Sequence, residues 1–426
     1  MAVKFPKTTP IEKENAVIDG VDISGHWSRM FEQRVIFEYT PELIEKITDL
    51  PDAESFAYCY QCAKCVPACP VDIVGDYGPR KLYKYAQTGT DLTQSPELWL
   101  CTTCANCLRV CPKEVNMAKI MPAAREQAIL GGSFVPKELQ DAFENTAKSG
   151  NPLGQPQRKR DAWIHSAGVS VPVIKDLSRP VDVLWYVGSY PSYHPRGMEA
   201  AFAAARIFTA LGIDFAVLGK EEKDDADSQR LAGEKGLFEM MAEYNIQTFG
   251  KYEWKEMIVT GPHELNAFKN VYPQYGFDRP VLHYTTFLVR YLEQLKHLLK
   301  HEVNLKVTYH DPCYLGRHNG EYEAPRKLLA AIPGVELVEM GRNRENGYCC
   351  GGGGGGMWTD SFSDPHVKMR LSEKRAQEAG ATGADVLAVA CPFEVSRFTD
   401  AVKSTGNEHV SVLDILELLD RSMRGE

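Results

Sequence analysis

The chain has 426 residues, of which 44% are hydrophobic and 25% are charged, and its formal net charge is −9. This composition is typical of a folded protein with two or three domains, and it excludes a disordered chain. The negative net charge argues against a nucleic-acid partner, and the lack of any apolar run of about 18 residues argues against direct insertion into a membrane.

Residues 1–50 are assigned to an N-terminal extension, which lacks the apolar segment of a secretory signal. We therefore expect a cytoplasmic protein that is at most peripheral on a membrane complex. Of the twelve cysteines, eight lie between Cys59 and Cys111 and four lie between Cys313 and Cys391. Because disulfides are rare in the reducing cytoplasm, these two groups predict metal centres.

Two cysteine runs within residues 51–130 share one spacing, C-x2-C-x2-C-x3-C followed by Pro. This spacing is typical of bacterial ferredoxins with two [4Fe–4S] clusters, in which the fourth cysteine of each run binds the other cluster. We therefore expect one cluster on Cys59, Cys62, Cys65 and Cys111, and a second cluster on Cys101, Cys104, Cys107 and Cys69. A pair of zinc sites is the alternative, although zinc sites more often use two C-x2-C pairs or histidines.

The spacer between the two runs predicts helices. Leu82, Tyr85 and Ala86 have helical spacing, and Ser95 followed by Pro96 is typical of a helix start. The stretches CYQCAKCVPACPVDIVGDYGPRKL and LWLCTTCANCLRVCPKEVNMAKIM resemble the ferredoxin-like C subunit of heterodisulfide reductases. Residues 51–130 are therefore expected to form an α-helical ferredoxin domain.

Residues 131–180 are rich in Gly, Pro and charged residues, which predicts an interdomain linker. The basic run from Arg158 to Arg160 is interpreted as a solvated face of this linker. A docking patch for a partner is the alternative.

From Val181 onward, short apolar runs alternate with helical patterns, which predicts α/β layers with mostly parallel strands. The pattern begins again near residue 301, so residues 181–300 and 301–426 are expected to be two copies of one unit. The first copy has Ser189, Asp224, Gly261 and Glu264 at landmark positions where the second has Cys313, Cys349, Cys391 and Glu394. We therefore expect the first copy to hold no cluster and to act as scaffold.

Four cysteines of the second copy are the candidate ligands of a third, redox-active cluster: Cys313, Cys349, Cys350 and Cys391. They follow predicted strands, and ligands bind at the carboxyl edge of open α/β sheets. The glycine run that starts with Gly351 and Gly352 permits close backbone approach and offers N–H groups to a cofactor. For the glycine run, the alternative is a flexible low-complexity loop. For the four cysteines, the alternatives are a zinc site and four unmetallated thiols.

The segments HDPCYLGR, CCGGGGGGMW and CPF resemble the cysteine-rich CCG domain of the B and D subunits of heterodisulfide reductases. That resemblance implies a noncubane cluster that is held by five cysteines and cleaves a disulfide. Glu394 stands where the fifth cysteine would be, so the third cluster could be cubane or noncubane. Glu394 could bind an exposed iron, leave one position open or be a solvated replacement. His310 is a candidate proton donor, with a packed histidine as the alternative.

These features predict an iron–sulfur electron-transfer subunit of a heterodisulfide-reductase-like complex. The sequence has no nucleotide-binding glycine fingerprint, so electrons are expected to enter and leave through partner subunits. The resemblance implies a flavoprotein and a membrane cytochrome b or quinone-reactive subunit as partners, and a disulfide as substrate. A pure electron relay and the iron–sulfur subunit of a glycolate or lactate oxidase are the alternatives.

Overall fold

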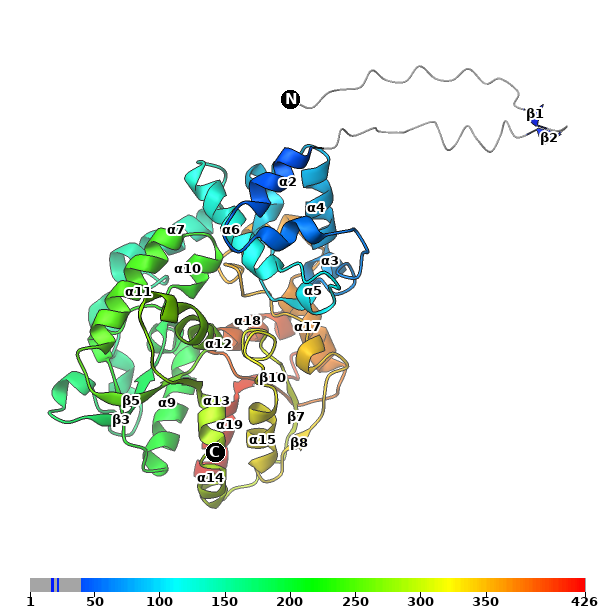
Figure 1. Cartoon of the computed structure of the whole chain (residues 1–426). Coiled ribbons are helices and arrows are strands. Elements are labelled where there is room, and N and C mark those ends of the chain that lie inside the picture. Colours follow the sequence, from blue (N-terminus) through cyan, green and yellow to red (C-terminus); the bar gives the residue numbers. More distant parts are fainter. Residues whose placement is uncertain (1–16, 19–20, 23–39, 426) are drawn as a thin grey trace.

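The computed structural model describes residues 17–18, 21–22 and 40–425. Figure 1 shows a helical module, drawn in blue and cyan, which sits against a larger part that contains the sheets. The two parts correspond to the predicted ferredoxin and α/β regions.

The expected N-terminal extension lies largely outside the described residues. Within it, strands β1 (Val17–Ile18) and β2 (Val21–Asp22) pair in antiparallel orientation. Helix α2 (Pro41–Thr48) is part of the helical module, because its buried Ile44 and Ile47 lie in the core of that module. The module therefore begins about ten residues earlier than the boundary that the sequence suggested at residue 50.

The helical module contains four further helices, α3 (Pro70–Val74), α4 (Pro79–Gln87), α5 (Asn106–Arg109) and α6 (Met117–Leu130). The prolines that open α3 and α4 occupy a position whose N–H has no partner inside a helix. Phe56, Trp99 and Ile120 are buried in the core. Between residues 40 and 180 the structure has no strand, as expected for an α-helical ferredoxin domain.

Residues 131–180 pack against the rest of the chain, although the sequence suggested a linker. They form helix α7 (Lys137–Ser149) and short 3-10 turns, and Trp163 is buried in the α/β core. Arg160, expected on a solvated face, is also buried and donates to Glu222 at 2.6 Å. Composition was a poor guide here because Gly and Pro mark turns between buried pieces as well as free linkers.

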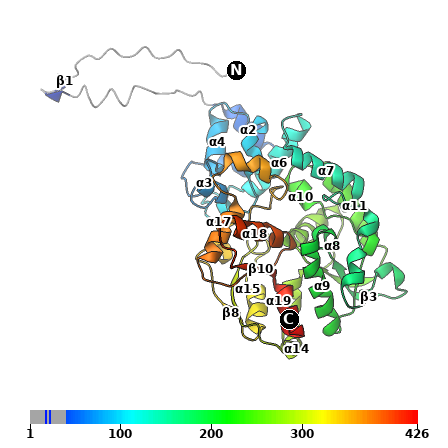
Figure 2. The same cartoon turned by 180° about the vertical axis from the view of Figure 1, so that it is seen from behind.

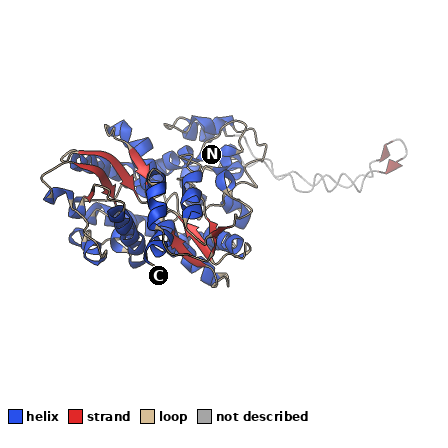
Figure 3. Cartoon of the chain, turned by 90° about the horizontal axis from the view of Figure 1, so that it is seen from below, coloured by secondary structure: helices blue, strands red, loops and turns tan. Residues whose placement is uncertain are grey.

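Two four-stranded sheets, both parallel throughout, form the α/β part (Figure 3). The first sheet contains β3 (Val181–Tyr186), β4 (Phe215–Val217), β5 (Trp254–Val259) and β6 (Val281–His283). The second contains β7 (Lys306–Tyr309), β8 (Glu336–Leu337), β9 (Val386–Val389) and β10 (Ser411–Asp414). Their orders, β4-β3-β5-β6 and β8-β7-β9-β10, are the same. The repeat seen in the sequence is therefore present in the topology, although the edge strands β6 and β10 were not predicted.

Helices surround both sheets. They are α8 (Ser189–Tyr193), α9 (Pro195–Ala210), α10 (Asp227–Leu231), α11 (Lys235–Phe249), α12 (Pro262–Asn266), α13 (Tyr284–Val289), α14 (Leu292–Leu298), α15 (Glu323–Ala331), α16 (Asp360–Ser363), α17 (Leu371–Gly380), α18 (Pro392–Ser404) and α19 (Ile415–Arg424). Figure 2 shows α9 beside α19, where the two halves meet. Arg206 and Asp420 form an ion pair of 2.6 Å across this contact.

The two halves present equivalent loops to one shared region. The segments that follow β7 and β9 carry Cys313 and Cys391, and those that follow β3 and β5 carry Ser189 and Gly261. The carboxyl edge of a parallel sheet is the usual ligand-binding edge. Both edges line the same cavity, described below.

Candidate metal centres

The cysteines expected to hold the first cluster line one cavity of about 510 Å³, together with Cys107. They are Cys59, Cys62, Cys65 and Cys111. Burial raises the pKa of the Cys59 thiol, and the nearby Cys111 and Cys62 raise it further. Cys62 is exposed, so this cavity opens toward solvent.

The cysteines expected to hold the second cluster line a smaller cavity of about 350 Å³. Cys69 of the first run lies there with Cys101, Cys104 and Cys107 of the second run, which is the sharing that the interleaved assignment requires. Burial raises the pKa of Cys69 to about 12, and the neighbouring Cys101 raises it as well. Binding of a metal here must therefore displace firmly held protons.

The two ferredoxin loops have the same backbone shape. Gln61 and Thr103 have φ angles of 65° and 51°, and Ala63 and Ala105 have φ angles of 67° and 60°. Left-handed φ costs a non-glycine residue about 1 kcal/mol, so four such residues at matching positions indicate loops shaped around something that they enclose. The turn also brings the Thr103 N–H to 3.4 Å from the sulfur of Cys101.

A third cavity, of about 750 Å³, lies between the two halves of the α/β part. Cys313, Cys350 and Cys391 line it from the second half, and Asp224 and Glu264 line it from the first. All five side chains are buried. The structure thus brings three of the four predicted ligands of the third cluster to one cavity.

Cys349, the fourth predicted ligand, does not line this cavity but lies against the ferredoxin module. Hydrogen bonds from the thiols of Cys104, Cys313 and Cys350 lower the pKa of Cys349 well below its ordinary value. Its sulfur is also 3.5 Å from the hydroxyl oxygen of Thr102. A sulfur of the third site therefore contacts a sulfur of the second ferredoxin run.

The glycine run permits this contact between the modules. A Cβ atom at Gly353 would lie 2.5 Å from the carbonyl oxygen of Thr102, and one at Gly354 would lie 2.4 Å from the carbonyl oxygen of Cys101. These distances are too short for any larger residue. The glycine run was expected to permit close backbone approach, and in the structure it lies against the backbone of the ferredoxin module.

The start of the same run donates hydrogen bonds to sulfur, as expected for Gly351 and Gly352. The Gly351 N–H lies 3.3 Å from the sulfur of Cys349, and the Gly352 N–H lies 3.5 Å from the sulfur of Cys350. Hydrogen bonds to sulfur ligands tune the potential of an iron–sulfur centre. These two glycines thus contact the predicted ligands directly.

Two arginines connect the ferredoxin module and the α/β part by donating hydrogen bonds to backbone carbonyls of both. Arg125, fully buried, donates to Leu98 and Cys101 in the ferredoxin module and to Leu231 and Gly354 in the α/β part. Arg317 donates to Cys104 at 2.7 Å and to Gly347 at 2.7 Å. Both therefore support the geometry around Cys104 and Cys349.

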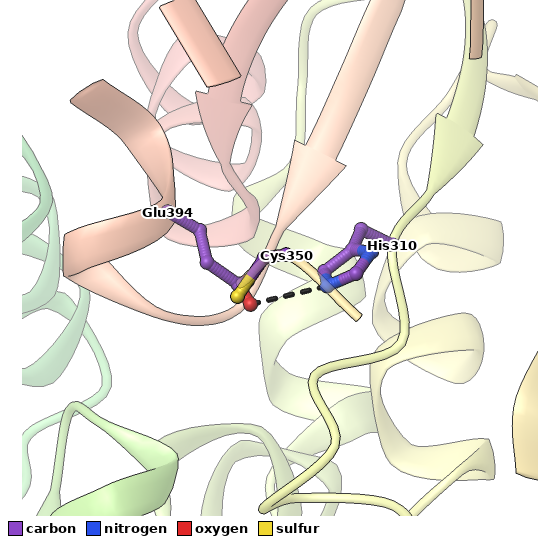
Figure 4. A group of neighbouring side chains, drawn as sticks. All are labelled: His310, Cys350 and Glu394. Carbon is purple, nitrogen blue, oxygen red and sulfur yellow. Dashed lines mark ion pairs between the residues drawn. The ribbon is translucent and has the colours of Figure 1, made fainter. Parts of the chain in front are cut away.

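Figure 4 shows His310, Cys350 and Glu394 with their polar ends together. One potential ligand atom from each lies within 4.8 Å of the other two. His310 Nε2 is 3.1 Å from Glu394 Oε1, a close polar contact that is not aligned as a hydrogen bond. Glu394 is only 3% exposed, so the interpretation of it as a solvated replacement was wrong.

Arg375 determines which nitrogen of His310 carries the proton. Its Nε donates to His310 Nδ1 at 3.1 Å, so Nδ1 is the acceptor and the proton of the neutral ring is on Nε2, facing Glu394. A protonated Nε2 is a poor metal ligand. Glu394 Oε2 has no hydrogen-bond partner among residues 40–425 and remains available for a metal or a proton.

The first half places oxygen where the second places sulfur. Ser189 donates to Asp224, and Arg160 donates to Ser189 at 2.9 Å. A Cβ atom at Gly261 would lie 1.9 Å from Glu264 Oε2, so this carboxylate fills the space of a side chain at position 261. These contacts support the expectation that the first half holds no cluster.

Two family models match the chain at these sites. The cysteine-rich domain CCG matches residues 307–393, and the 4Fe-4S dicluster domain matches residues 58–116. The D subunit of the dihydromethanophenazine:CoB–CoM heterodisulfide reductase of Methanosarcina barkeri is 33% identical over 322 residues, which are 72% of this chain and 74% of that protein. The chain belongs to the family of heterodisulfide-reductase-like iron–sulfur oxidoreductases. The 4Fe-4S dicluster domain and the cysteine-rich domain indicate that this chain binds iron–sulfur clusters.

Other members of the family are longer. The probable iron-sulfur-binding oxidoreductase FadF of Bacillus subtilis is 35% identical over 306 residues, and the EtfAB:quinone oxidoreductase of Syntrophomonas wolfei is 32% identical over 305 residues. The alignments cover 71% and 70% of this chain but only 43% of each relative. The chain thus spans less than half the length of these relatives. In residues 40–425, no helix has the length and apolar character needed to cross a bilayer.

Sequence reasoning missed the residues that support the sites. Arg125 interrupts an apolar helical stretch, and this interruption was the signal in the sequence that could have indicated a buried arginine with a structural role. Arg375 lies in a helix rich in charge, where nothing in the sequence distinguishes it from solvated neighbours. Cys104 was assigned to a cluster, but its contact with Cys349 depends on how the modules dock.

Proposed function

We propose that this chain transfers electrons between partner subunits and a third iron–sulfur centre, at which a disulfide is reduced. Two [4Fe–4S] clusters would be held by the eight ferredoxin cysteines in the interleaved pattern. The third centre would be held by Cys313, Cys349, Cys350 and Cys391. When bound, these groups supply one-electron steps at sulfur-ligated iron.

The contact between Cys104 and Cys349 carries this proposal. It links the second ferredoxin cavity to the third site through ligand atoms, with no intervening side chain. Cys107 reaches both ferredoxin cavities and links the first to the second. The ligand contacts therefore form one continuous route through the chain.

The exposed end of this route is the expected docking place for a redox partner. Cys62 is exposed there, and Tyr60 beside it is 57% exposed. The names of relatives include a quinone and a heterodisulfide among the reactants. A flavoprotein, or a membrane cytochrome b or quinone-reactive subunit, fits the electron-entry side, and the chain would then be cytoplasmic and peripheral on a membrane complex.

The lining of the third cavity favours substrate chemistry over a pure relay. A relay needs ligands from one half only, whereas Cys313, Cys350 and Cys391 share their cavity with side chains of the other half. His310 lies beside Glu394, with its Nε2 3.1 Å from Oε1.

Iron and acid-labile sulfide, measured per chain on anaerobically purified protein with redox-titrated EPR, test the proposal. We expect about 12 iron atoms and a signal that differs from those of the two [4Fe–4S] clusters. About 8 iron atoms, with both ferredoxin signals intact, would contradict a resident third centre.

Glu394 is proposed as an oxygen ligand of the third centre, because its carboxyl group lies beside Cys350 and its Oε2 has no hydrogen-bond partner among residues 40–425. Glu394→Cys should change the spectrum of the third centre toward that of an all-thiolate site and leave the ferredoxin signals unchanged. The control is Glu408→Cys on the surface, which should change neither spectrum. An unchanged third signal in Glu394→Cys would show that residue 394 is not a ligand.

A further inference from the structure

The first half of the α/β part contributes a carboxyl group to the third cavity that the electron route does not use. Glu264 follows β5 in the segment Pro262-His263-Glu264, and Glu394 follows β9 in the corresponding segment Pro392-Phe393-Glu394. Both glutamates line the cavity. The two halves thus place equivalent carboxyl groups at one space, although only the second half supplies cysteines.

Glu264 is held without a partner for one of its oxygens. Its side chain is 3% exposed, and Oε2 has no hydrogen-bond partner among residues 40–425. Gly188 and Gly261 leave room for the carboxyl group, because a Cβ atom at either position would lie within 2.7 Å of it. A buried, unpaired carboxylate is costly, so this oxygen must carry a proton or meet a ligand.

From this geometry we infer that Glu264 is the proton donor of the third cavity. This inference rests on the proposed reduction of a disulfide. In that reaction the S–S bond breaks, two electrons arrive from the reduced partner subunit, and one proton moves from Glu264 to a departing sulfur. The products are one thiol and one thiolate, so atoms and charge balance. Solvent then returns the proton to Glu264.

The charged groups around Glu264 are compatible with this role. Asp224, Asp225 and Asp227 face it from the loop before α10 and from α10 itself, His263 precedes it, and Cys391 faces it from the second half. His283, on the adjacent β6, is neutral because burial lowers its pKa to about 3. Asp227 is paired with Arg230 at 2.6 Å and with His263 at 2.8 Å.

Burial raises the pKa of Glu264 to about 7, with Asp224 and Asp227 also raising it and its own backbone N–H and His263 lowering it. A general acid works best when its pKa lies near the operating pH. The acid form is present below the pKa, so the rate of proton transfer should hold below about pH 7 and fall above it.

The test uses anaerobic holoprotein, reduced with stoichiometric titanium(III) citrate and mixed with either of two disulfides. Hydroxyethyl disulfide releases a basic thiolate that needs a proton, whereas dithiobis(nitrobenzoate) releases a weakly basic thiolate that does not. Glu264→Gln should slow reoxidation by hydroxyethyl disulfide about 100-fold and leave reoxidation by dithiobis(nitrobenzoate) unchanged. Glu243→Gln, the same substitution at an exposed position in this half, should affect neither. Equal rates in Glu264→Gln and wild type, or equal slowing with both disulfides, would overturn the inference.

A second measurement needs no substrate. If Glu264 exchanges its proton as the third centre changes charge, the midpoint potential of that centre falls with rising pH around pH 7 in wild type and is flat in Glu264→Gln. A flat wild-type profile, or the same slope in both proteins, overturns the inference. A wild-type slope that disappears in the variant, without reduction of either disulfide, would instead refute the disulfide substrate and keep Glu264 as the proton-exchanging group.

Discussion

Cys350→Ala is expected to remove the third centre and to abolish disulfide reduction, while both ferredoxin clusters remain. Cys350 lines the third cavity, accepts the Gly352 N–H and lies beside Glu394, but it does not line either ferredoxin cavity. Iron content should therefore fall from about 12 to about 8 atoms per chain. Iron and sulfide analysis with EPR measures this change.

The matched control is Cys62→Ala, in the solvent-facing cavity far along the ligand route from the third site. It should disturb the first ferredoxin signal and preserve the third. If Cys350→Ala altered a ferredoxin signal and kept the third one, the division of cysteines among the centres would be wrong.

Arg125→Leu is expected to loosen the contact between the ferredoxin module and the α/β part. Its guanidinium satisfies four backbone carbonyls from three separate segments, and a buried leucine would satisfy none. Each buried carbonyl left without a donor costs about 1 kcal/mol or more, so the loss at four carbonyls should lower the free energy of unfolding by roughly 4 kcal/mol. Urea unfolding, followed by circular dichroism and cluster absorbance, measures the loss.

The same substitution should also lower the reduction potential of the second cluster. Arg125 forms no ion pair with a carboxylate among residues 40–425. Burial lowers the pKa of Arg125, and among the neighbouring acidic groups Cys101 opposes this effect most strongly. Removing a buried positive charge disfavours the more negative, reduced state of the nearby cluster. Arg158→Leu, which removes an exposed arginine, is the control and should change neither stability nor potential. Equal behaviour of the two variants would contradict the role assigned to Arg125.

The ferredoxin module was predictable because its ligands are local in sequence. A cysteine run fixes a tight loop by its spacing alone, and both runs line the expected cavities. The strands in the centre of each sheet were predictable for a similar reason, since buried parallel strands are continuous apolar runs. Strands β6 and β10 are short and lie at sheet edges, where composition carries less signal.

Properties that depend on packing between distant segments could not be read from the sequence. The sequence placed Cys313, Cys349, Cys350 and Cys391 in one site, but it could not show that Cys349 also interacts with Cys104 of the ferredoxin module. Glu394 was open to three interpretations because burial, rather than residue type, decides among them. The packed state of residues 131–180 has the same cause, since Trp163 and Arg160 are buried by partners far away in the chain.

The burial of the second ferredoxin loop has a consequence for the order of maturation. Cys104 and Cys69 are 6% and 7% exposed, and the glycine run closes over the backbone of Cys101 and Thr102. A carrier that delivers iron and sulfide cannot reach these thiols once the α/β part has docked. We expect the second cluster to be inserted before docking, whereas the first, with Cys62 exposed, can be lost and rebuilt in the finished protein.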